Sequence, residues 1–175
     1  PPYWRRPSHA KEEWPGLPTA IVGKIDTLGE RAHLNLGEKE LNEAGTTIHN
    51  WFAADPMEGD VEARIELARE FLPNQGCAGL VRPDALVGSV DALRGFVDRR
   101  WPGAIWRREV PISGLIASRD GVCRATGIMD LLLETPAGWV IVDHKIYPGR
   151  HETWGAKALE YGPQLAAYRE LLTTD

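Results

Sequence analysis

Two apolar segments in the second half of the sequence each carry an acidic residue. Asp130 follows Ile128 and Met129 and precedes three leucines, and Asp143 closes a run of valine and isoleucine. A carboxylate among apolar residues costs free energy unless it is ion-paired or binds a metal. Two carboxylates on adjacent strands can converge, and a divalent cation between them would offset their mutual repulsion. The pattern therefore predicts a metal site.

Lys145 adds a positive charge close to this predicted site. It lies two residues after Asp143, and residues two apart on a strand point to the same face. Hydrolysis of a phosphodiester uses a hard cation to polarise the phosphate and a positive group to hold the charge that develops. From these residues alone, a buried ion pair between Asp143 and Lys145, with Asp130 at a strand end, remains the alternative.

The segments that must position these residues predict an α+β fold. Residues 105–116, 122–134 and 139–146 are rich in β-branched and aromatic residues, with Gly121 and Gly138 at the turns, so we expect three strands joined as hairpins. Apolar spacing of three and four predicts helices over 39–54, 61–72, 83–100 and 154–172. We expect Pro73 to end the second helix and Pro163 to kink or restart the last one near Tyr161. Helices followed by strands and a final helix favour α+β over alternating α/β.

The remaining sequence suggests one domain over 1–175, with an irregular arm over 1–38 docked through Trp4 and Trp14. The chain starts without Met and ends soon after a helical pattern, so we expect a segment of a longer protein. It contains no apolar run long enough to span a bilayer and no signal-peptide core, so we expect a cytoplasmic, bacterial-type protein without membrane contact.

Charge and cysteine content limit the cofactors and partners. The net charge of −5 weighs against nucleic-acid binding, although carboxylates that hold a metal contribute to it. Arginines cluster between 94 and 108, where they form either a solvated face or a DNA-facing patch. Cys77 and Cys123 cannot build a four-thiolate iron–sulfur or zinc site.

Four short motifs occur in one order between residues 45 and 168. They are Gly-x-x-x-His ending at His49, Gly-x-x-Asp ending at Asp130, Asp143-x-Lys145, and Gln-x-x-x-Tyr from Gln164 to Tyr168. The ordered set resembles the RecB-like branch of the PD-(D/E)XK nucleases, and within it the C-terminal nuclease domain of AddA- or RecB-type helicase–nucleases. The resemblance implies a restriction-endonuclease-like core, with a central mixed sheet of four or five strands flanked by helices.

The same resemblance implies roles for the matching residues. Asp130 and Asp143 would bind Mg²⁺ or Mn²⁺, with the main-chain carbonyl of His144 and the side chain of His49 as further ligands. Lys145 would position the attacking water and steady the phosphate. Gln164 and Tyr168, four apart on one helical face, would reach the site. A core role for His49, and for Tyr168 with Gln164 beside it, stays open. Glu109 is similar to a recurrent acidic position of this branch, and we do not count it among the catalytic residues.

The function implied is hydrolysis of DNA by metal-activated water, without a covalent intermediate, in double-strand break repair and recombination beside a helicase. The iron–sulfur-bearing relatives need four cysteines, so that cofactor is excluded. No G-x-x-x-x-G-K-[ST] loop occurs, so an ATP-driven motor would lie elsewhere in the parent protein or on a partner. Two alternatives remain open: a stand-alone nuclease of CRISPR or phage defence, and a catalytically silent DNA-binding module.

Overall fold

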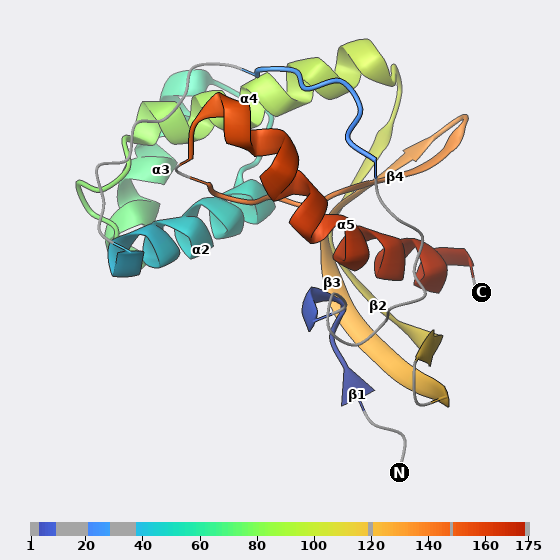
Figure 1. Ribbon diagram of the computed structural model, residues 1–175. Coiled ribbons are helices and arrows are strands. Elements are labelled where there is room, and N and C mark those ends of the chain that lie inside the picture. The colour runs from blue at the N-terminus through green and yellow to red at the C-terminus, as the bar shows by residue number, and fades with distance from the viewer. Residues whose placement is uncertain (1–3, 10–20, 29–37, 119–120, 148, 174–175) are drawn as a thin grey trace. The chain divides into compact units, whose positions relative to one another are not determined.

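The computed structural model describes residues 4–9, 21–28, 38–118, 121–147 and 149–173 (Figure 1). Its contacts divide the chain into two compact units. The sheet unit comprises Pro1–Ile25, Ile105–Asp143 and Gly149–Asp175, and the helical unit comprises Asp26–Ala104 and His144–Pro148. The boundary between Asp143 and His144 falls inside the Asp-x-Lys motif.

Among its described residues, the helical unit contains three helices, α2 (Glu38–Ala54), α3 (Val61–Asn74) and α4 (Pro83–Arg100). Their apolar positions recur at three- and four-residue spacing, so each helix presents one apolar stripe. The stripes form a common core of buried residues, which includes Ala44, Trp51, Ala68, Leu72, Leu86, Val87 and Val90. All three helices were predicted from this spacing. The helix α3 runs two residues past the expected end, because Pro73 sits in its last turn, where few further hydrogen bonds are lost.

A buried ion pair ties α3 to its neighbours. Arg64 on α3 is 3% exposed and Asp55 is fully buried. The Arg64 Nε and Nη2 atoms each donate to a different Asp55 oxygen at 2.9 Å, and Nη1 donates to Asp91 on α4 at 2.7 Å. The main-chain N–H of Met57 donates to Asp55 Oδ1 at 2.6 Å. Both charges are thus compensated by hydrogen bonds, which a buried ion pair requires.

The sheet unit is built on a long antiparallel hairpin of β2 (Ile105–Ser118) and β3 (Gly121–Thr135). The strand β4 (Gly138–Val142) pairs with β3 antiparallel, and the short β1 (Trp4–Arg5) pairs with β3 parallel. The result is a mixed four-stranded sheet, which confirms the predicted fold class. Gly121 and Gly138 have φ of 114° and 122°, so the turns use glycine where other residues would be strained.

The two edges of β3 are covered differently. β2 pairs with β3 over nearly its whole length, so β1 and β4 share the opposite edge. On that edge β1 pairs with Arg124 and Ala125, and β4 pairs with 131–135. Within the described residues, the stretch 126–130 therefore has no strand partner on this edge. Asp130 lies at the end of this gap.

The helix α5 (His151–Thr173) packs on one face of the β2–β3 hairpin (Figure 1). Its Ala167 and Leu171 form a buried cluster with Ile116, Cys123 and Ala125. Pro163 lies inside this single helix, so the sequence was right about one final helix, which begins three residues earlier than expected. Figure 1 shows the helix changing direction partway along its length, in agreement with the expected kink.

Two expectations need correction. The third strand ends at Val142 instead of continuing to residue 146, so Asp143 and Lys145 are not strand residues, and strand alternation does not fix their directions. The arm over 1–38 is not irregular throughout, since it contains β1 and a 3₁₀ turn at Pro7–His9. Trp14 and the side chain of Trp4 lie outside the described residues. Among those that are described, no helix is long and apolar enough to cross a membrane.

We expect Arg64→Leu to lower the free energy of unfolding by about 3–5 kcal/mol, because it leaves the Asp55 carboxylate buried without its partner. Arg69→Leu on the same helix is the matched control. Arg69 pairs with Glu66 and both side chains are more than half exposed, so this change should leave the free energy of unfolding almost unchanged. Urea denaturation of both variants measures the difference, and equal losses would contradict the stabilising role of the buried pair.

Candidate metal centre

Three acidic residues fall on one row across β2, β3 and the end of β4. The β2–β3 register pairs Arg108 with Leu131 and Val110 with Met129, so Glu109 stands opposite Asp130. The β3–β4 register pairs Leu131 with Val142, and its continuation by one residue puts Asp143 opposite Asp130. The β2–β3 ladder omits the pair at this row, and the β3–β4 ladder ends one pair before it. The three acidic residues therefore lie where regular pairing is absent.

A proline determines which type of pair forms along β2 and β3. Pro111 stands opposite Ile128 and has no N–H to donate. In an antiparallel sheet it fits only where its nitrogen faces away from the partner strand, which makes Pro111–Ile128 a non-hydrogen-bonded pair. Pair types alternate along the ladder, so the row of Glu109 and Asp130, two residues away, is of the same type. Opposing side chains are closest in such pairs.

Glu109 has a backbone conformation that is unusual for a strand. Its φ is 51°, in the left-handed region, where a residue with a side chain is strained. The register is the same on both sides of it, so the strain does not come from an inserted residue. It affects one residue, whose carboxylate faces Asp130.

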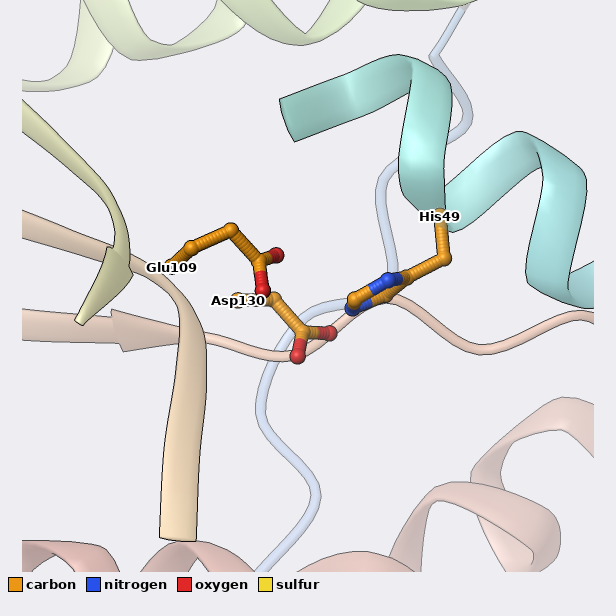
Figure 2. Close-up of side chains that lie close together, drawn as sticks. All are labelled: His49, Glu109 and Asp130. Atoms are coloured by element: carbon orange, nitrogen blue, oxygen red, sulfur yellow. The ribbon is translucent and has the colours of Figure 1, made fainter. Parts of the chain in front are cut away.

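The Glu109 and Asp130 carboxylates approach each other closely. Each offers an oxygen within 4.8 Å of an oxygen of the other, and Figure 2 shows both side chains turned to one point. Glu109 is exposed and Asp130 is half-buried. Like charges directly opposite each other on paired strands are destabilising, and a hard divalent cation that binds carboxylate oxygens would reverse the sign of that interaction. The donor set fits Mg²⁺ or Mn²⁺.

Asp143 is held from the helix α5. Gln164 Nε2 donates to Asp143 Oδ1 at 3.1 Å, and both residues are half-buried. The Gln164 amide therefore holds the Oδ1 atom of Asp143 in place. The expected proximity of Gln164 to the acidic residues is present, and its contact is with a carboxylate.

Tyr168 contacts β3 within residues 126–130, the stretch without a described strand partner on the edge that β1 and β4 share. Its hydroxyl donates to the main-chain carbonyl of Ile128 at 2.7 Å, two residues before Asp130, and the side chain is 4% exposed. In a non-hydrogen-bonded pair the Ile128 carbonyl points away from β2, to the edge that no strand covers here. The tyrosine thus satisfies a main-chain acceptor that would otherwise lack a partner strand.

Gly127 makes room for this contact. A Cβ atom on Gly127 would lie 3.0 Å from Tyr168 Cε1 and 3.1 Å from Pro7 Cδ, closer than ordinary contacts. The glycine of Gly-x-x-Asp and the tyrosine of Gln-x-x-x-Tyr therefore belong to one packing arrangement. Sequence spacing alone did not show this link, because the two residues are 41 positions apart.

Burial raises the pKa of Tyr168. The Gln164 amide opposes this shift through a hydrogen bond, and the charges of Asp143, Asp130 and Glu109 add to it, because a nearby carboxylate disfavours a phenolate. The hydroxyl therefore remains a donor at every pH at which an ordinary tyrosine does. The influence of all three acidic residues on one phenol also supports their common location in the sheet unit.

The Gly-x-x-x-His motif lies on the face of α2 that holds the segment after Asp143. Within the helical unit, the His144 ring packs on Phe52 with centroids 4.4 Å apart and lies 6.4 Å from the His49 ring. A Cβ on Gly45 would lie 3.8 Å from Ile146 Cδ1. Lys145, between His144 and Ile146, is exposed.

The structure thus groups Asp130, Asp143, Gln164 and Tyr168 within the sheet unit and adds Glu109, which sequence analysis left out of the site. The strand register was the signal that could have found Glu109, because residues 109 and 130 pair in any hairpin closed at 119–120. The strained φ has no signature in the sequence. His49, labelled in Figure 2 on α2, and Lys145 belong to the helical unit.

We expect Tyr168→Phe to lower the free energy of unfolding by about 1–3 kcal/mol, because it leaves the Ile128 carbonyl unsatisfied. The raised pKa adds a pH dependence: the stabilising contribution is complete below the unfolded tyrosine pKa of about 10 and is lost as pH rises towards the folded value. Denaturation at neutral pH and above pH 10 should therefore show that the difference in free energy of unfolding between the wild type and Tyr168→Phe becomes smaller at high pH. A deficit that stays constant with pH would contradict this assignment.

Comparison with known families agrees with this geometry. A family model described as the PD-(D/E)XK nuclease superfamily matches residues 21–175, a range that covers the opposed carboxylates and all four motifs. A search of curated proteins found no match. Nucleases of this superfamily use divalent metal ions, which the carboxylate donors described above suit. The chain belongs to the PD-(D/E)XK nuclease superfamily.

Proposed function

We propose that this chain is a divalent-metal-dependent deoxyribonuclease of the RecB-like branch. The observation that carries the proposal is the strained Glu109 carboxylate opposite Asp130, in a row that continues to Asp143. Strain and like-charge repulsion at one place both cost stability, and a bound cation gives a physical reason for their presence. Membership of a nuclease superfamily supplies the reaction class.

The proposed ligand set consists of oxygen donors and one imidazole. Asp130 and Asp143 are its main carboxylates, and Glu109 joins them. The main-chain carbonyl of His144 and the side chain of His49 complete it, as the four-motif resemblance implies. When bound, Mg²⁺ or Mn²⁺ polarises the phosphate and makes water a better nucleophile.

Lys145 is proposed to hold the attacking water and to neutralise charge on the phosphate. The water oxygen forms a bond to phosphorus, the bond from phosphorus to the leaving oxygen breaks, and the leaving oxygen takes up a proton. Support for this role comes from the exposed ammonium two residues after Asp143. An ammonium near a developing oxyanion stabilises it most where water is excluded.

Gln164 and Tyr168 are proposed to act as positioning residues. Gln164 orients Asp143 through its carboxylate, and Tyr168 fixes the β3 main chain before Asp130. Both therefore influence the reaction through the acidic residues. Loss of either should weaken metal binding without changing the pH at which the reaction is fastest.

The biological setting proposed is DNA double-strand break repair and recombination beside a helicase, in the cytoplasm. Its support is the resemblance of the four ordered motifs to helicase–nucleases, together with two buried thiols, Cys77 and Cys123, that form no disulfide. The helicase would be linked to this chain or associated with it.

Cleavage of labelled DNA by the purified chain tests the function. We expect Mg²⁺ or Mn²⁺ to support cleavage, EDTA to abolish it, and Asp143→Ala or Lys145→Met to reduce it by about 100-fold or more, as loss of a transition-state contact does. Glu152→Gln, at an exposed position of α5, is the control and should retain activity. Absence of cleavage with any metal, while DNA binding persists, would favour the catalytically silent module.

Metal-dependent thermal stability tests the ligand set separately from catalysis. In EDTA, Glu109→Gln should raise the melting temperature because it removes the repulsion from Asp130. With Mn²⁺, the wild type should gain more than Glu109→Gln, His49→Ala or Asp130→Asn, since a ligand that binds only the folded state stabilises it by mass action.

Glu170→Gln, an exposed substitution on α5, is the matched control and should respond to Mn²⁺ as the wild type does. Equal Mn²⁺-induced shifts in Glu109→Gln and the wild type would remove Glu109 from the ligand set. Equal shifts in all three ligand variants and the wild type would reject the proposed site.

A further inference from the structure

The β2–β3 hairpin has a second face, opposite the one that packs on α5. Along β3 the residues with odd numbers from Cys123 to Met129 face α5, and those with even numbers face the other way. The register matches each even β3 position with an odd β2 position. Four pairs form this face, which we call the outer ladder: Pro111–Ile128, Ser113–Thr126, Leu115–Arg124 and Ala117–Val122.

The outer ladder leads directly to the acidic row. Asp130 is the next even residue of β3 after Ile128, and Glu109 stands opposite it. By the alternation that Pro111 determines, all four pairs are of the type in which opposing side chains lie closest. The ladder is therefore a continuous surface, two strands wide, that ends at the proposed metal site.

The ladder exposes large apolar side chains and offers hydrogen-bond donors. Leu115, Val122 and Ile128 are 53%, 69% and 54% exposed. Ser113, Thr126 and Arg124 supply hydroxyl and guanidinium donors. None of these eight described positions is acidic, in a chain with 25 acidic residues, so the face has no carboxylate of its own that would repel an anion.

We propose that the outer ladder binds the single-stranded nucleic acid that enters or leaves the site, which deepens and rests on the proposed function. An anionic chain that approaches the acidic row on this face from the Gly121 end of the hairpin would cross the ladder. In a duplex the apolar faces of the bases are buried by stacking. The exposed aliphatic side chains of the ladder would then meet phosphates. A single strand presents unstacked bases and sugars to Leu115 and Ile128 and phosphates to Arg124.

Binding without metal tests this inference independently of cleavage. The probe is a fluorescein-labelled thymidine oligonucleotide, titrated with the whole chain in EDTA and followed by anisotropy. We expect Leu115→Glu to weaken binding by about tenfold, since it replaces an apolar contact by a charge that repels phosphate. Leu67→Glu, on α3 at 46% exposure against 53% for Leu115, is the matched control and should bind as the wild type does.

Arg124→Gln provides a second variant that does not alter an apolar contact. Loss of one phosphate contact should reduce the slope of log affinity against log salt by about 0.7 for a single strand. A labelled duplex of the same length should bind more weakly than the single strand. Thermal melting of each variant confirms that it is folded.

Several results would overturn the inference. They are absence of single-strand binding by the wild type, equal binding by Leu115→Glu and Leu67→Glu, and preference for the duplex. Conversion of a wild-type dimer to a monomer by Leu115→Glu in sedimentation would assign the face to self-association instead. If Leu115→Glu loses binding while the wild type cuts no DNA with any metal, the ladder stands and the nuclease proposal fails.

Discussion

Repulsion between two carboxylates held opposite each other is the constraint on which this site depends. Glu109 and Asp130 are brought together by the pairing of β2 with β3, which is fixed by some dozen other pairs along the hairpin. Their main chains cannot separate without breaking that pairing, so the fold keeps the two residues opposite each other. The left-handed backbone at Glu109 concentrates strain at the same position. A scaffold this extensive is what keeps an unfavourable local arrangement populated.

The helix α5 is the second element of this scaffold. It contacts the hairpin through buried apolar residues. Two polar residues one helical turn apart, Gln164 and Tyr168, add hydrogen bonds. Gln164 reaches Asp143 and Tyr168 reaches the β3 main chain, so one rigid helix sets the positions of two acidic residues that lie 13 apart in sequence. Gly127 permits the close approach that this requires.

Much of the fold followed from periodicity, and the acidic residues of the site followed from their apolar surroundings. All four long helices, the three antiparallel strands and the two glycine turns were predicted, because apolar spacing and turn residues act locally. Asp130 and Asp143 were predicted from charges in apolar surroundings, and Gln164 and Tyr168 from motifs that resemble the RecB-like branch; their roles in a site stay predictions. The structure places Gln164 of the last helix within hydrogen-bond distance of Asp143.

The errors arose where tertiary contacts override local preference. β4 stops at Val142 and does not continue to the expected residue 146, and the residues that follow it pack on α2 through His144 and Ile146. β1 forms from two residues without strand periodicity because β3 offers it an edge. Glu109 was set aside because a single sequence does not report a strained φ, although the hairpin register could have placed it opposite Asp130. The division into two compact units within the Asp-x-Lys motif also has no local signal.

Pro111 has a consequence for the behaviour of the protein in solution. β2 is a 14-residue strand that pairs with β3 along one edge, and the described residues supply no strand for its other edge. A long open edge can recruit strands of other molecules into a growing sheet. At Pro111 the ring takes the place of an N–H that would face the open edge of β2. The strained backbone of Glu109, two residues earlier, interrupts the row of main-chain donors and acceptors on that edge. The residue that sets the pairing type of the hairpin thereby also removes a donor that an added strand would need.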